Sequence, residues 1–143
     1  MYEGIIFAVI AAVALGIWTV FHQQASNHIN NLFGAIIVSA TAVVLGLIFL
    51  LPKIKSTALY TNPKGILFSV LAGFCALAID YFALKAYGTG GLPISIGGPI
   101  IIAGSVAIAS VIGFFLGESV TLMKIVGLTL VIAGSAILAA FTG

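Results

Sequence analysis

Charged side chains are scarce in this chain. Its 143 residues include five Lys or Arg and three Asp or Glu, so that only 6% of the sequence is charged. An ordinary globular domain carries about 25% charged residues. A chain with so little charge cannot cover itself with a solvated surface, and 62% of its residues are hydrophobic. We therefore exclude a soluble domain and a disordered chain.

Cysteine and clustered ligands are also lacking. The single cysteine, Cys75, excludes a disulfide framework and a multi-cysteine zinc site. The spacing of His22 and His28 matches no standard metal-ligand pair, so we expect no metal. The run Gly88-Thr89-Gly90-Gly91 lacks the Gly-Lys-Ser/Thr of a phosphate-binding loop, and no nucleophile elbow occurs. We therefore expect no cofactor and no enzymatic activity. Scattered lysines with a net charge of +2 form no basic patch, so we expect no nucleic-acid partner.

What the sequence does contain is five long apolar runs. A helix needs about 20 mostly apolar residues to cross roughly 30 Å of hydrocarbon. The runs cover residues 4–21, 32–51, 65–85, 92–116 and 125–141. They are too long and too continuously apolar for the roughly 10-residue alternating strands of a membrane barrel. The sequence predicts an all-α integral membrane protein with five transmembrane helices in a single domain, residues 1–143.

The distribution of lysines predicts the orientation of these helices. Five crossings place Lys53, Lys55, Lys64 and Lys124 on the side of the N-terminus, and only Lys85 approaches the other side. Because lysines are enriched on the cytoplasmic side, we expect a cytoplasmic N-terminus in a multi-pass protein of the cell membrane. An odd number of helices is unusual for a self-sufficient carrier, and many carriers pair two inverted units around a central site. The chain therefore resembles half of such an arrangement.

Asp80 is the most informative position in the sequence. It lies about 22 Å beyond Gly65 along the third run, which places it several ångströms inside the hydrocarbon. A carboxylate facing lipid there costs about 2.5–3.5 kcal/mol, so we expect Asp80 to face the bundle interior or a water-filled cavity. Such a position suits proton coupling or cation binding. The alternative is a static internal partner for Tyr81 or Lys85.

The end of the first run gathers polar side chains around a tryptophan. Trp18 and His22 are four residues apart and so share one helix face, next to Thr19 and Gln23. These residues could line the mouth of a cavity. Alternatively, they form an interfacial layer at the headgroup level, where tryptophan is enriched. We favour the interfacial interpretation for His22, and for His28 in the polar stretch that follows.

The fourth run is interrupted near its start by Gly97-Gly98-Pro99. Pro99 cannot donate a backbone hydrogen bond, and it disturbs the preceding turn. A hydrophobic segment interrupted by Gly and Pro is a good sequence indicator of a transporter's binding region. The alternative is a simple helix kink, which membranes tolerate when neighbouring groups satisfy the freed backbone.

Several short motifs follow one another along the second half of the sequence in an order that is typical of a known family. They are Tyr81-Phe82-Ala83-Leu84-Lys85-Ala86, the small-residue turn 88–91, Pro99, Leu116-Gly117-Glu118-Ser119-Val120-Thr121, and finally Gly127 and Ala133-Gly134. In this order and spacing, the sequence resembles the EamA-like family of the drug/metabolite transporter superfamily. The resemblance implies a carrier of small metabolites or toxic compounds that works by alternating access.

The resemblance also implies partners and a site. Complete family carriers look like two inverted five-helix repeats, so this chain would pair with a second copy or with another five-helix membrane chain. Many relatives place an acid where this chain has Gly98, which leaves Asp80 as the candidate for coupling. We expect a small polar cavity for a small-molecule substrate, lined by Asp80, Tyr81, Trp18 and Pro99. Glu118 is expected to order the turn before the last helix. The alternative function is a non-transporting membrane subunit that modulates or scaffolds a partner.

Overall fold

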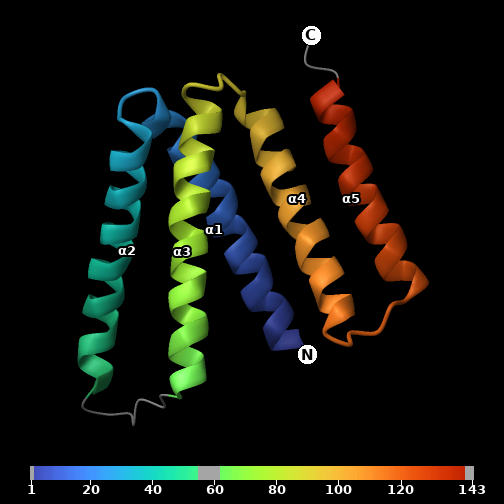
Figure 1. Ribbon diagram of the computed structural model, residues 1–143, viewed down its shortest axis with the longest axis horizontal. Helices are drawn as coiled ribbons and strands as arrows, with labels where there is room; N and C mark the ends of the chain where they lie inside the picture. The colour runs from blue at the N-terminus through green and yellow to red at the C-terminus, as the bar shows by residue number, and fades with distance from the viewer. Residues whose placement is uncertain (1, 55–61, 141–143) are drawn as a thin grey trace. The chain divides into compact units, whose positions relative to one another are not determined.

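The computed structural model describes residues 2–54 and 62–140, and throughout this part of the chain the regular structure is helical (Figure 1). The helices are α1 (Tyr2–Ser26), α2 (Asn31–Ile54), α3 (Pro63–Tyr87), α4 (Ile94–Phe115) and α5 (Leu122–Ala140). All five are long and apolar enough to cross a membrane. The predicted all-α membrane fold with five spanning helices is confirmed. Residue 141, the predicted end of the last run, and Lys55 lie outside the described residues.

The surfaces of these helices are apolar. Large side chains such as Ile6, Phe49 and Phe115 are well exposed, and Phe115 is 88% exposed. Soluble proteins rarely expose contiguous apolar patches of more than a few hundred Å². In a bilayer the same side chains contact lipid tails, so the exposed apolar surface is what a membrane-spanning fold requires.

The helix ends differ from the predicted ends of the apolar runs where polar residues continue a helix. α1 does not stop at Phe21 but continues to Ser26, whose hydroxyl donates a 2.7 Å hydrogen bond to the carbonyl oxygen of Gln23. α2 then begins after Asn30, whose side-chain oxygen accepts a 3.0 Å hydrogen bond from the backbone N–H of Leu32. A polar stretch therefore ends the apolar run without ending the helix. As a consequence, His22 belongs to α1.

The chain divides into two compact units. The second unit, His22–Gly90, contains the last turn of α1 and the hairpin of α2 and α3. In this unit the two hairpin helices lie side by side (Figure 1), and they approach closely at Gly34. A Cβ added there would lie 2.8 Å from Cδ1 of Leu84, a fully buried side chain. Glycine at position 34 thus lets α2 reach α3.

The first unit, Met1–Phe21 with Gly91–Gly143, contains the hairpin of α4 and α5. Gly117 has a φ of +93°, a left-handed conformation that glycine adopts without strain. The N–H of Glu118 donates to the carbonyl of Gly113 at 3.0 Å, and the N–H of Gly117 to that of Phe114 at 3.1 Å. This is a Schellman cap. Thr121 Oγ1 then accepts a 3.3 Å hydrogen bond from the N–H of Lys124 and caps α5. The motif Leu-Gly-Glu-x-x-Thr therefore stops one helix and starts the next.

Candidate functional site

Two ionisable side chains meet inside the second unit. His22, in the last part of α1, places Nε2 3.3 Å from Oδ1 of Asp80 in α3. Both residues are buried, with 3% of His22 and 7% of Asp80 exposed. Each belongs to a segment that can span a membrane. A pair of ionisable groups in such a segment is costly to bury unless the two groups interact.

The partner of Asp80 differs from those that the sequence indicated. Lys85 is exposed, and Tyr81 instead packs edge-to-face against Phe82 with ring centroids 5.1 Å apart. Lys85 is five residues beyond Asp80, so it points away from the face that Asp80 occupies. The helix continues past His22 and buries it beside Asp80, a contact that the sequence analysis did not predict, and the interfacial position of His22 stays a prediction. His28, in contrast, is exposed.

The pair has a simple proton chemistry. A neutral imidazole beside a carboxylate carries a net charge of −1, and one added proton brings the pair to zero. The proton can reside on either partner, and the two groups titrate as a unit. Uptake of one proton therefore neutralises the pair, and release of that proton leaves a single negative charge on the carboxylate of Asp80 in a medium of low dielectric constant.

A buried tyrosine, Tyr87, lies on the same face of α3 as Asp80. Asp80, Leu84 and Tyr87 are spaced four and three residues apart, and all three are buried. Within residues 2–54 and 62–140, the hydroxyl of Tyr87 has no hydrogen-bond partner. Buried polar groups normally have a partner, so this hydroxyl is available to a ligand or to water. The sequence analysis did not select Tyr87.

The other predicted site residues belong to the first unit. Trp18 in α1 and Pro99 in α4 are both half-buried. α4 runs through Pro99 as a helix from Ile94 to Phe115, so the proline removes one backbone donor without ending the helix. Asp80 and Tyr81 belong to the second unit. That these four residues line one cavity therefore stays a prediction.

The glycine before Pro99 lies against α1 within the first unit. A Cβ added to Gly98 would lie 3.4 Å from Cγ2 of Thr19, an ordinary van der Waals contact. Thr19 is buried, and its hydroxyl donates a 2.8 Å hydrogen bond to the carbonyl of Leu15. This contact is therefore apolar, with its one hydroxyl already bonded.

In the described part of the chain, no three His, Cys, Asp or Glu residues are placed to hold a metal ion.

Comparison with known proteins identifies the family. The model of the EamA-like transporter family matches residues 2–140, which is nearly the whole chain. The chain belongs to the EamA-like transporter family. Neither curated proteins nor solved structures provide a match. Family membership and five spanning helices make this a multi-pass membrane protein, a transporter of the drug/metabolite type.

In this EamA-like transporter, one signal in the sequence could have indicated His22. An ionisable residue within a membrane span needs a partner of complementary chemistry. The topology predicted from five consecutive spans brings the end of the first helix, which holds His22, and the end of the third, which holds Asp80, to the same side of the membrane. Treating the polar run after Phe21 as the continuation of a helix would have brought the two together.

Proposed function

We propose that this chain is one half of a secondary transporter that moves small metabolites or toxic compounds across the cell membrane by alternating access. Two five-helix units of opposite orientation, either two copies or this chain and a second one, enclose the substrate site. The N-terminus lies in the cytoplasm. The observation that carries the proposal is the buried His22–Asp80 pair within membrane-spanning helices of a transporter family member.

The chemistry of the pair supports coupling to protons. When the pair gains or loses a proton inside a membrane span, its net charge changes by one unit. The same change alters how strongly the pair attracts water and how strongly it attracts a cationic substrate. The unpartnered hydroxyl of Tyr87 on the same face of α3 supplies a donor for a polar substrate. Tyr81, half-buried next to Asp80, supplies an aromatic surface. These features favour a small cationic or aromatic compound, exchanged for protons.

The same pairing favours one other function. His22 Nε2 and Asp80 Oδ1 lie 3.3 Å apart, within ion-pair distance, which is also what a static structural pair requires. In that case the chain is a membrane subunit that modulates or scaffolds a partner and moves no substrate itself. The two functions differ in whether flux depends on the His22–Asp80 pair of this chain.

Flux through reconstituted vesicles, measured with the unaltered chain and with Asp80→Asn, distinguishes the two. The purified chain is reconstituted, and a panel of cationic, aromatic and neutral small compounds is screened under an imposed pH gradient. We expect saturable, gradient-dependent movement of at least one compound. The matched control is Asp80→Asn, which keeps the size and a hydrogen-bonding side chain but removes the charge. Absence of flux from the chain alone, together with flux that a second membrane chain restores equally with the unaltered chain and with Asp80→Asn, would support the subunit function.

A further inference from the structure

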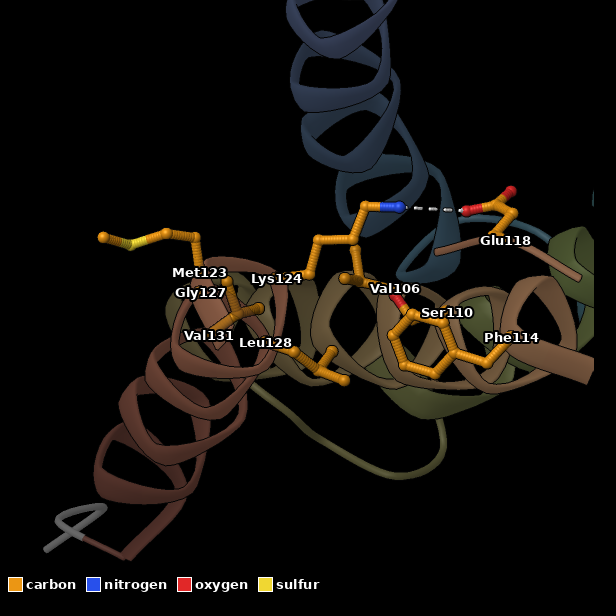
Figure 2. Close-up of a pocket in the computed structure, with 9 residues that line it drawn as sticks. All are labelled: Val106, Ser110, Phe114, Glu118, Met123, Lys124, Gly127, Leu128 and Val131. Atoms are coloured by element: carbon orange, nitrogen blue, oxygen red, sulfur yellow. Dashed lines mark ion pairs between the residues drawn. The ribbon is translucent and has the colours of Figure 1, made fainter. Parts of the chain in front are cut away.

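A groove lies between α4 and α5 in the first unit, far along the sequence from the His22–Asp80 pair. Its volume is about 300 Å³. Figure 2 shows the residues that line it, which are Val106, Ser110 and Phe114 of α4, Glu118 of the connecting turn, and Met123, Lys124, Gly127, Leu128 and Val131 of α5. We call this feature the α4–α5 groove. The proposed transport function uses none of these residues.

The groove is charged at one end, and apart from the hydroxyl of Ser110 its remaining lining is apolar. Glu118 lies in the turn between α4, which ends at Phe115, and α5, which begins at Leu122, and Lys124 lies in the first turn of α5. We expect this end of the two candidate spans to meet the headgroup region. From Lys124 the lining continues along α5 to Val131, about 10 Å deeper. The α4–α5 groove thus matches a membrane lipid in polarity, because the lipid also has a charged headgroup at one end and an apolar chain along the rest.

The charged end of the groove holds one acidic and one basic side chain, and a ligand can replace the ion pair between them. Lys124 Nζ lies 3.6 Å from Glu118 Oε2, and the side chains are 45% and 64% exposed (Figure 2). An exposed ion pair of this kind contributes little stability, so a ligand with matching charges can replace it. Lys124 Nζ also donates a 2.9 Å hydrogen bond to the carbonyl of Ser119, which holds the ammonium at the mouth of the groove.

We propose that the α4–α5 groove binds one phospholipid with a primary-amine headgroup, of the phosphatidylethanolamine type. The lipid ammonium donates to the carboxylate of Glu118, and its phosphate accepts from the ammonium of Lys124. An acyl chain lies along Phe114, Leu128 and Val131. A choline headgroup has no N–H to donate, and a glycerol headgroup has no cation to meet Glu118. The need for an N–H donor therefore excludes the choline headgroup, and charge complementarity excludes the glycerol headgroup, so that the primary amine is selected.

Gly127 provides a test of the groove. A Cβ added at Gly127 meets nothing within 4 Å, so a leucine there fills the groove without disturbing a packed contact. Gly134 on the same helix also has open space around it and does not line the groove, which makes it the matched control. The full chain is purified, delipidated and titrated with phosphatidylethanolamine bearing a photoactivatable acyl chain. Native mass spectrometry then counts bound lipid, and peptide mapping locates the cross-link.

We expect one lipid per chain, cross-linked within residues 106–131. Gly127→Leu should weaken binding about tenfold or more, and Gly134→Leu should leave it unchanged. In Glu118→Gln the preference for phosphatidylethanolamine over phosphatidylcholine should disappear, while an apolar chain still enters the groove. Equal binding by Gly127→Leu and the unaltered chain would overturn the proposal, as would equal affinity of the unaltered chain for both headgroups. If Gly127→Leu separates a dimer and no lipid is retained by either form, a second copy covers the groove and the proposal is wrong.

Discussion

Asp80 shows how a single carboxylate constrains a membrane protein. Of the two acidic side chains that the structure describes, Asp80 and Glu118, Asp80 is the one that is placed within a candidate span and buried. Burial away from lipid lowers the cost of the charge, and His22 at 3.3 Å offsets part of what remains. The position of Asp80 therefore depends on a residue more than 50 positions earlier in the chain.

We predict that His22 and Asp80 are energetically coupled. His22→Leu or Asp80→Leu alone leaves one buried ionisable group without its partner, and each should lower the free energy of unfolding by about 1–3 kcal/mol. The double variant removes both polar groups and should recover most of that loss. Reversible unfolding in detergent micelles measures the four chains of the cycle. Cys75→Leu, on an exposed part of α3, is the control and should change little. Additive losses in the double variant would show that the two residues do not interact.

At the residue scale, the sequence identifies Asp80 but not its environment. The cost of a charge in hydrocarbon is a property of one residue, so it can be argued from position alone. The identity of the partner depends on which helices pack together and how far each one extends. The sequence analysis did not pair His22 with Asp80, because the polar run that contains His22 marks the end of the apolar sequence, whereas α1 continues to Ser26. Tyr87 was not selected because burial of a terminal hydroxyl is invisible in a helical pattern.

At the scale of elements, the two hairpins are built differently. α4 and α5 are joined by a turn that the sequence specifies residue by residue, with a left-handed Gly117 and a capping Thr121. That turn can be read from the motif. α2 and α3 instead depend on a close approach at Gly34, next to the buried Leu84. Nothing in the sequence distinguishes Gly34 from the other glycines of the chain, because the contact belongs to the neighbouring helix.

We predict that Gly34 is required for packing of the α2–α3 hairpin. In Gly34→Leu the new side chain meets Cδ1 of Leu84, and the helices must separate or Leu84 must leave its site, at a cost of about 1–3 kcal/mol. Gly46→Leu, on the same helix with open space around it, is the matched control and should be tolerated. Thermal unfolding in detergent, followed by circular dichroism, measures both. Equal midpoints for the two variants would contradict a packing role for Gly34.

At the scale of the whole molecule, the sequence predicts the fold class and family well. Five apolar runs set the number of helices, and all five are present as spans. The order of motifs indicated the EamA-like family, which the match over residues 2–140 confirms. The contacts with a partner chain cannot be predicted from one sequence. Composition and hydropathy indicate that a helix can contact lipid, but they do not indicate which helix contacts another protein. The dimer and the inverted arrangement therefore remain proposals.

The most direct test of the transporter proposal is whether substrate movement drives protons through Asp80. Vesicles containing the chain enclose a pH-sensitive dye, and a gradient of a transported compound is imposed without any initial pH difference. The unaltered chain should produce a proton flux that follows the substrate. Asp80→Asn, inserted and assembled to the same extent, should move no protons. An undiminished proton flux in Asp80→Asn would contradict the account, because the buried pair would then have no part in coupling.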